Sequence, residues 1–156
     1  MHKKLIATAA LVAAAVVAGV ASGGAATQQQ IAFVYANGNP GKMTLTPLTS
    51  GPVARDSGST SWCCWTQKFV RRDGESVEID NPLATFVGKR GSLTWRERIT
   101  WVNSGNGYFI TTGTWKVAGG TGAYKHLAGR GHLAFVSGAG DKVLTFRAVG
   151  LVDQAR

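Results

Sequence analysis

The glycine-rich stretch at residues 113–131 constrains the fold of this chain more than any other segment does. Its residue order predicts a strand that ends at Val117, a glycine corner, one turn of helix and a second corner into another strand, because glycine permits sharp turns. Tyr124 and Leu127 lie three apart on that turn, so we expect them to close one end of the fold as an apolar plug. The corner glycines are Gly119, Gly120, Gly122, Gly129 and Gly131.

The first 26 residues have the order of a secretory signal peptide. Residues 2–4 are basic, residues 5–20 are apolar and uncharged, and small residues follow to Ala26. Cleavage after Ala21 or after Ala26 fits the preference for small residues at such sites. A retained membrane anchor is the alternative, but the apolar run of 16 residues falls short of the roughly 20 that span a bilayer. We therefore expect an extracellular protein without a stable membrane anchor, built from a signal peptide (1–26), an N-terminal segment (27–41) and a β-barrel domain (42–156).

Short runs rich in Val, Ile, Thr, Trp, Tyr and Phe, separated by turns that contain glycine, fill the rest of the chain. This pattern predicts an antiparallel all-β fold. The expected strands span residues 31–35, 42–47, 61–71, 76–86, 92–102, 108–117, 131–136 and 142–152. Because about eight strands in one sheet must protect their edges, we predict a single closed antiparallel β-barrel.

Alternation along residues 92–102 predicts an inner face of four apolar residues around one carboxylate. These residues are Leu93, Trp95, Glu97, Ile99 and Trp101. Desolvation among such neighbours raises the pKa of a carboxylate, which makes Glu97 a candidate general acid or base, or an anchor for a polar ligand group. The alternatives are a partner cation, a position in water at the barrel mouth, and a bulge that turns the side chain outward.

Aromatic residues gather on the predicted inner face and form the candidate ligand-binding set. They are Trp95, Trp101, Phe109, Trp115 and Phe146. Such a face suits a hydrophobic guest and a core filled by side chains equally well, because eight-stranded barrels occur in both forms. On the last strand, the same alternation points Leu144, Phe146, Ala148 and Val152 inward and Arg147 outward.

Two adjacent cysteines, Cys63 and Cys64, lie on the predicted strand at 61–71, so one is expected to face the core and the other solvent or a neighbour. Three states remain open: two unpaired thiols, a strained disulfide between neighbours, and a bridge to another molecule through the outward thiol. Neither cysteine has the spacing to a histidine that a zinc site needs. His126 and His132 lack nearby carboxylates and are expected to be hydrogen-bonded or exposed, so no metal site is predicted.

Seventeen basic and eight acidic residues give the chain a net charge of +9. Removal of Lys3 and Lys4 with the signal peptide leaves fifteen basic and eight acidic residues, or +7. This excess favours contact with anionic polymers or surfaces. The basic residues are scattered, however, and no nucleic-acid-binding module is recognisable, so we expect no nucleic-acid partner.

The glycine corner resembles a signature of the allene oxide cyclase and dirigent-like barrel superfamily, and within it the secreted bacterial members of unknown function. The resemblance rests on the motif at 119–122, on Tyr124 and Leu127, and on the Gly-Arg-Gly at 129–131, with similar motifs at 51–53, 88–93 and 113–115. It covers roughly residues 42–152. It implies an eight-stranded barrel with a largely apolar interior, no metal or organic cofactor, and a homo-oligomer, specifically a trimer.

Members of that superfamily hold hydrophobic molecules in their barrels. The plant cyclases fold a reactive fatty-acid epoxide, and the dirigent proteins position phenolic radicals. Their active-site residues lie outside the shared corner, so the resemblance assigns no catalytic residue to this chain.

Three functions follow from these observations. The favoured one is a secreted barrel that binds a small hydrophobic molecule without chemistry. The second is a structural or cell-surface interaction protein with a filled barrel, whose basic face contacts anionic polymers. The third is a cofactor-free isomerase or cyclase in which the barrel holds the substrate and Glu97 moves a proton.

Overall fold

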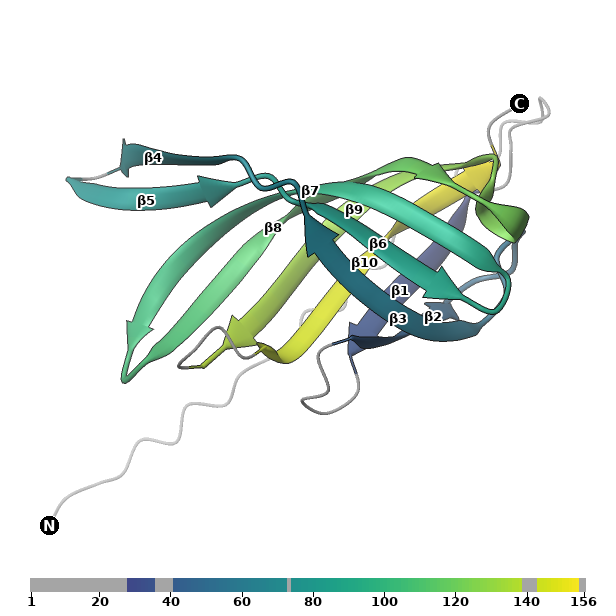
Figure 1. Cartoon of the computed structure of the whole chain (residues 1–156), viewed down its shortest axis with the longest axis horizontal. Coiled ribbons are helices and arrows are strands. Elements are labelled where there is room, and N and C mark those ends of the chain that lie inside the picture. Colours follow the sequence, from purple (N-terminus) through teal and green to yellow (C-terminus); the bar gives the residue numbers. More distant parts are fainter. Residues whose placement is uncertain (1–27, 36–40, 73, 139–142, 155–156) are drawn as a thin grey trace, which may run out of the picture.

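The computed structural model describes residues 28–35, 41–72, 74–138 and 143–154, which are almost entirely β-sheet (Figure 1). The predicted signal peptide lies outside the described residues. The elements are β1 (Gln29–Tyr35), β2 (Lys42–Pro47), β3 (Asp56–Cys63), β4 (Gln67–Arg72), β5 (Glu75–Asp80), β6 (Leu83–Gly88), β7 (Gly91–Gly105), β8 (Tyr108–Gly120), the short 3-10 helix η1 (Gly122–Tyr124), β9 (Leu127–Ser137) and β10 (Val143–Gln154). No helix among the described residues has the length and apolar character needed to cross a membrane.

Eight of the strands close into an antiparallel barrel, which confirms the predicted fold class. Around the ring the order is β7-β6-β3-β2-β1-β10-β9-β8, and β8 pairs back with β7 to complete the circle. β1 lies between β2 and β10, so the ring includes part of the segment 27–41 that was expected to precede the barrel domain. Each strand of the ring therefore has a hydrogen-bonded neighbour on both sides, which protects its edges.

β4 and β5 form a hairpin that extends beyond the ring (Figure 1). It continues the pair of β3 and β6, because short breaks separate β3 from β4 and β5 from β6. The predicted single strands 61–71 and 76–86 are therefore wrong, since each is split in two. Cys64 adopts a left-handed φ of 58° in the first break. Pro82 lies in the second break, where it has no N–H to offer a neighbouring strand.

The glycine corner closes one end of the barrel, as predicted, but its bounds differ. β8 continues past Val117 to Gly120, and β9 begins at Leu127, so Gly129 and Gly131 lie within β9 and form no second corner. η1 follows β8 after a single residue, and both Tyr124 and Leu127 are buried in the core. Gly122 has a left-handed φ of 56°, and a side chain at this position would meet the carbonyl of Arg90. A side chain at Gly120 would meet the backbone of Tyr124. These two positions therefore need glycine for the chain to turn back onto the barrel.

A buried carboxylate that was not predicted, Asp56 at the start of β3, holds this corner together. Its Oδ1 accepts hydrogen bonds from the backbone N–H groups of Ser57 (2.8 Å) and Lys89 (3.1 Å). Its Oδ2 accepts from the Arg90 N–H (3.0 Å) and the Tyr124 hydroxyl (2.8 Å). Burial raises the pKa of Asp56, but these hydrogen bonds outweigh it and hold the pKa below its ordinary value.

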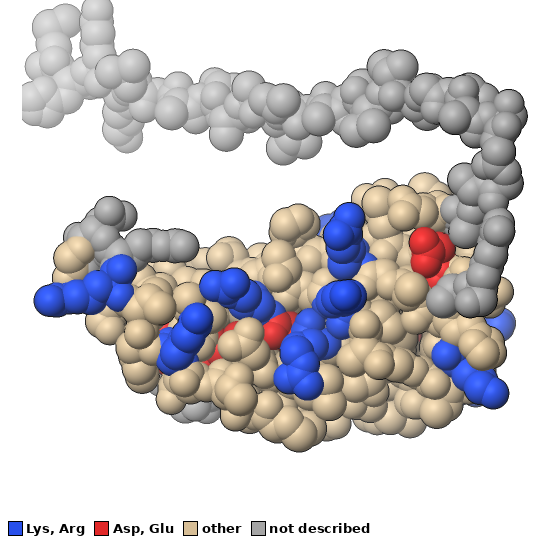
Figure 2. All heavy atoms as spheres, turned by 90° about the horizontal axis from the view of Figure 1, so that it is seen from above, with Lys and Arg blue, Asp and Glu red and all other residues tan. Residues whose placement is uncertain are grey.

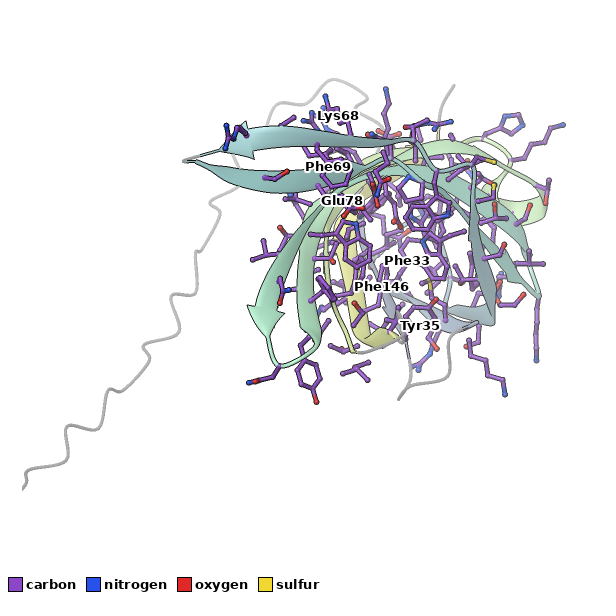
Figure 3. All side chains as sticks on the ribbon, turned by 60° about the vertical axis from the view of Figure 1, so that its left-hand side comes forward. Phe33, Tyr35, Lys68, Phe69, Glu78 and Phe146 are labelled. Carbon is purple, nitrogen blue, oxygen red and sulfur yellow. The ribbon has the colours of Figure 1, made fainter. Side chains whose placement is uncertain are left out.

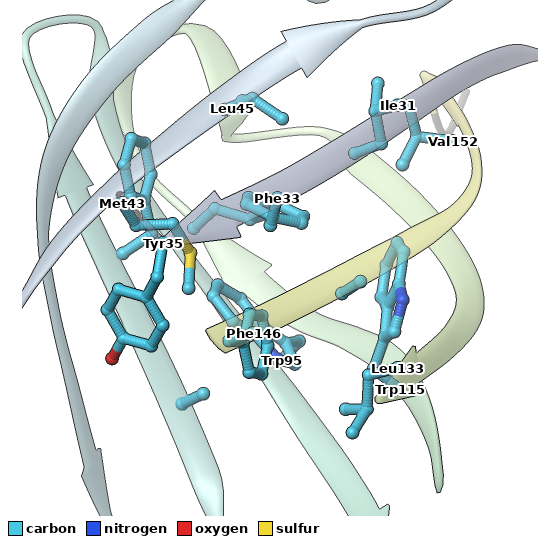
Figure 4. Close-up of a cluster of buried hydrophobic side chains, with 14 of the residues drawn as sticks. Ile31, Phe33, Tyr35, Met43, Leu45, Trp95, Trp115, Leu133, Phe146 and Val152 are labelled. Carbon is cyan, nitrogen blue, oxygen red and sulfur yellow. The ribbon is translucent and has the colours of Figure 1, made fainter. Parts of the chain in front are cut away.

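The half of the barrel next to the corner is filled by side chains (Figure 4). Phe33 stacks on Trp95 with ring centroids 4.9 Å apart, and it meets Trp115 edge-on at 5.9 Å. Around these rings pack Ile31, Leu45, Phe86, Leu93, Tyr124 and Val152. The same core continues to Tyr35, Phe135 and Phe146 at the opposite end of the barrel, where a cavity remains.

Inward and outward positions follow the predicted alternation on β7 and β8. Glu97 is buried between the exposed Arg96 and Arg98. On β8, Trp115 is buried. Phe109 is half-buried and packs edge-on against Trp101, which lies on the inner face of β7. The inner face of these two long strands was therefore predicted correctly, although their pairing shifts register next to Trp95.

One predicted inward position on the last strand is wrong. Leu144 is exposed, and Val143 packs against the core in its place. The pairing of β10 with β9 shifts register between Val143 and Thr145, and a shift of one residue turns the side chains to the opposite face. Beyond the shift the prediction holds, because Phe146 is buried and Arg147 is exposed.

The prediction for the two cysteines is also wrong in part. Both Cys63 and Cys64 are exposed, so neither faces the core. Trp62 takes the inward position on β3 and packs against the core. The structure has no disulfide between these two neighbours.

Candidate ligand-binding site

A cavity of about 500 Å³ lies at the end of the barrel opposite the glycine corner. Its walls come from strand ends remote from η1, namely the ends of β1, β3 and β9 and the starts of β8 and β10, together with β5 and the middle of β7. Its volume is within the range of roughly 300–1,000 Å³ that is typical of small-molecule sites. The aromatic lining residues are Tyr35, Trp62, Trp65, Trp101, Phe109, Phe135 and Phe146.

The aromatic rings form one continuous wall. Trp101 meets Phe135 edge-on with centroids 5.2 Å apart, and Phe135 stacks on Phe146 at 6.0 Å. Tyr35 meets Phe146 edge-on at 5.4 Å and lies 5.6 Å from Trp62. Figure 3 shows Tyr35 and Phe146 inside the ring of strands. The cavity is therefore a hydrophobic pocket built from facing strands of the barrel.

Glu97 is the carboxylate at the base of this wall, and its side chain is only 1% exposed. Its Oε1 accepts hydrogen bonds from the indole N–H of Trp95 (2.8 Å) and of Trp62 (3.4 Å). Burial raises the pKa of Glu97 to about 7, and the two hydrogen bonds offset only part of that rise. The side chain points inward, so the outward bulge considered from the sequence does not occur.

Two further carboxylates on β5 line the same cavity and were not predicted. Glu78 lies opposite Trp101 of β7, and Asp80 lies opposite Ile99. Directly paired residues share a face of the sheet, so both acidic side chains project to the inner side. Figure 3 shows Glu78 on the side of the hairpin that faces the barrel, and Lys68 on the other side.

Asp80 is buried with one oxygen left unsatisfied. Its Oδ2 accepts a hydrogen bond from the indole N–H of Trp101 at 2.9 Å. Its Oδ1 is buried and has no hydrogen-bond partner in the described part of the chain. Burial raises the pKa of Asp80. The Trp101 hydrogen bond lowers it in part, and the charge of Glu78 raises it further. This oxygen is therefore a buried acceptor that no donor among the described residues satisfies.

The structure brings together four of the six predicted site residues. Glu97, Trp101, Phe109 and Phe146 line the cavity. Trp95 and Trp115 lie instead in the filled half of the barrel, because their inward positions fall closer to the glycine corner. Trp95 reaches the site only through its hydrogen bond to Glu97.

Basic side chains gather on the outer surface of the barrel. Arg96, Lys116 and Arg130 lie side by side across β7, β8 and β9, and they line an outer groove with Arg98 and His132. Figure 2 shows a face of the molecule with many Lys and Arg side chains and few Asp and Glu. The positive charge is therefore carried on the surface, whereas carboxylates gather in the cavity.

The predicted histidine positions carry no sign of a metal site. His126 and His132 are both exposed. Within the described ranges, no group of three or more His, Cys, Asp or Glu residues is arranged to hold a metal ion.

Comparison of the chain with known protein families, with curated proteins and with solved structures finds no significant match.

Proposed function

We propose that this chain is a secreted β-barrel protein that binds a small hydrophobic molecule in the cavity opposite the glycine corner. The observation that carries the proposal is the cavity of about 500 Å³ with its aromatic wall. A barrel that acts only as a structural element needs no such space. The resemblance of the corner to the allene oxide cyclase and dirigent-like barrels supports the same function, because those barrels hold hydrophobic molecules.

The aromatic wall is sufficient to bind a small ligand with useful affinity. A ligand that loses about 200 Å² of apolar surface to the cavity gains about 5 kcal/mol from the hydrophobic effect. Part of that gain is offset by the lost freedom of the ligand. Because neighbouring rings of the wall contact one another, little further ordering of the wall is needed on binding.

Native mass spectrometry of the protein secreted by its own host tests the proposal, with organic extraction to identify any released compound. We expect one small molecule per barrel. Val143→Trp places a large ring at the cavity wall and should abolish the adduct. Leu151→Trp adds the same bulk on the exposed face of β10 and should keep it. A mass without any adduct, together with failure of added hydrophobic compounds to bind, would overturn the proposal.

A second candidate function is a cofactor-free isomerase or cyclase. The observation that favours it is the pKa of Glu97 of about 7, which lets this carboxyl both accept and donate a proton near neutral pH. The extracted ligand, incubated with the protein in heavy water, should then exchange carbon-bound protons for deuterium. Glu97→Gln should keep binding and lose the exchange. Equal exchange with and without the protein would exclude this function.

A further inference from the structure

The cavity carries a surplus of negative charge inside a basic protein. Glu78, Asp80 and Glu97 line it, and the described residues of its wall include no Lys, Arg or His. Asp80 lies opposite Ile99 of β7, which places it diagonally across from Glu97, two residues earlier on that strand. Diagonal neighbours on paired strands lie about 7–8 Å apart. The two carboxyl-bearing residues are therefore neighbours on the wall of the cavity.

Both carboxylates lack a cationic partner among the described residues. Asp80 keeps one buried oxygen without any hydrogen bond, and an unsatisfied buried polar group costs about 1–3 kcal/mol. Glu97 receives only neutral indole N–H groups, and both of them go to Oε1. A ligand that brings a positive charge and N–H donors would satisfy both groups at once.

An organic cation fits this site better than a metal ion does. The described part of the chain holds no cluster of three or more metal-ligating side chains, whereas the indole rings of Trp62 and Trp101 line the cavity beside the carboxylates. Ammonium groups are attracted to aromatic faces by about 0.5–2 kcal/mol. The volume of about 500 Å³ also leaves room for an apolar body that a metal ion does not have.

We infer that the cavity binds an organic ammonium ion, with the charged nitrogen between Asp80 and Glu97 and the apolar body against Phe135 and Phe146. This inference rests on the proposed function, because it names the chemical class of the same ligand. It explains why acidic and aromatic side chains share one wall while the basic side chains lie outside.

The charge of the site depends on pH in a defined direction. The titratable groups that face the nitrogen from the described wall are Tyr35 on β1, Glu78 and Asp80 on β5, and Glu97 on β7. Burial raises the pKa of Tyr35 above its ordinary value, so its hydroxyl stays neutral. Glu97 releases its proton as the pH rises from 5 to 8, because it titrates with a pKa of about 7. The attraction for an ammonium group therefore increases over this range.

Three ligands with the same indole body and different head groups test the inference: tryptamine, tryptophol and indole-3-acetate. Calorimetric titration at pH 8 should show tryptamine binding at least tenfold more tightly than tryptophol, and indole-3-acetate binding more weakly than both. An alkyl ammonium group has a pKa near 10, so tryptamine stays charged throughout. Its advantage over tryptophol should therefore shrink several-fold at pH 5.

The possible outcomes separate this inference from the proposed function. Equal affinity for tryptamine and tryptophol, at both pH values, would overturn the inference and leave the proposed function standing. Tighter binding of indole-3-acetate would do the same. Failure of all three ligands to bind at millimolar concentration would overturn the inference and count against the proposed function as well.

Two variants test the carboxylates individually with little change in side-chain volume. Asp80→Asn and Glu97→Gln should each lower tryptamine affinity at pH 8 by about tenfold and leave tryptophol affinity within twofold. Asp153→Asn removes the same charge near the glycine corner, at the far end of β10, and should change neither affinity. A variant that also no longer binds tryptophol has lost the cavity itself. The tryptamine and tryptophol affinities of the wild-type protein at pH 5 and pH 8 then decide whether the inference holds.

Discussion

The folded protein holds the Glu97 carboxyl at a pKa of about 7, whereas its ordinary value is 4.5. Between these two pH values the folded state keeps a proton that the unfolded chain has released. The stability that this group contributes is therefore complete below pH 4.5 and is lost as the pH rises through 7. A shift of this size corresponds to about 3 kcal/mol in the free energy of unfolding.

Urea unfolding of wild-type protein and of Glu97→Gln, measured from pH 4.5 to 8, checks this expectation. The wild-type free energy of unfolding should fall over the range, and that of the variant should fall much less. Asp80, whose pKa is also raised, accounts for the slope that remains in the variant. Asp153→Asn serves as the control and should retain the wild-type profile. Parallel profiles for wild type and Glu97→Gln would show that the carboxyl is solvated.

Glu97 and Asp80 face the same cavity, but only Glu97 could be predicted from the sequence. Alternation along β7 places Glu97 between Trp95 and Ile99, so its burial followed from the pattern alone. On β5 the acidic residues alternate with Val77 and Ile79, and the usual rule of apolar residues inward directs Asp80 to solvent. The rule fails there because β5 leaves the ring, and its inner face borders a cavity instead of a packed core.

At the scale of single elements, the corner between β6, β7 and η1 depends on the carboxylate of Asp56. Asp56→Ala removes an acceptor for three backbone N–H groups and for the Tyr124 hydroxyl. Each unsatisfied buried donor costs about 1–3 kcal/mol, and water can satisfy part of them, so we expect a loss of about 3 kcal/mol in the free energy of unfolding. Tyr124→Phe removes one hydrogen bond and should cost about 1 kcal/mol.

Chemical unfolding at pH 7 measures the loss in the free energy of unfolding for both variants. The prediction is that Asp56→Ala loses more than Tyr124→Phe. If Tyr124→Phe cost as much as Asp56→Ala, the hydroxyl contact would hold the corner instead of the backbone contacts. The pH dependence gives a second check, because the pKa of Asp56 is lowered on folding. Its stabilisation is present above the unfolded value of 3.8 and is lost as the pH falls through the folded value. Asp56→Ala should therefore lose less stability on acidification than wild type does.

Element boundaries were predicted well where strands are regular, and poorly where they break. The strand at 42–47 coincides with β2, and the glycine corner has the predicted order of elements. The breaks after Cys63 and before Leu83 were missed. The first contains a left-handed φ at Cys64, and no glycine stands at that position to indicate such a turn. The exposure of Leu144 was missed for a similar reason, since a register shift is set by pairing with β9.

At the scale of the whole molecule, β7 explains how a barrel and an extra hairpin share one sheet. Its residues 91–96 pair with β6, its residues 99–101 pair with β5, and β8 covers its other edge. The number of strands in the ring was predictable from the turn spacing and the need to protect edges. The hairpin was not, because two long predicted strands contain both ring segments and hairpin segments.

The hairpin therefore forms a wall of the site that the ring does not need for closure. Replacing residues 64–82 by Asn-Gly joins Cys63 to Leu83, which are already paired across β3 and β6, and Asn-Gly favours such a turn. The eight strands of the ring remain in the shortened chain, so we expect a folded barrel with a single cooperative unfolding transition. The cavity should be lost, because Glu78, Asp80 and Trp65 leave with the hairpin.

The pKa of Glu97 shows whether the hairpin shields the site from water. Glu97 lies at the junction between hairpin and ring, where its N–H donates to the carbonyl of Pro82 at 3.0 Å. Without the hairpin, water reaches the carboxyl and the desolvation that raises its pKa is relieved. Carboxylate NMR of the shortened protein should therefore show the Glu97 pKa falling from about 7 toward its ordinary value, together with loss of tryptamine binding. A pKa that stays near 7 in a folded, shortened barrel would mean that the ring alone buries Glu97. The hairpin would then have no part in the electrostatics of the site.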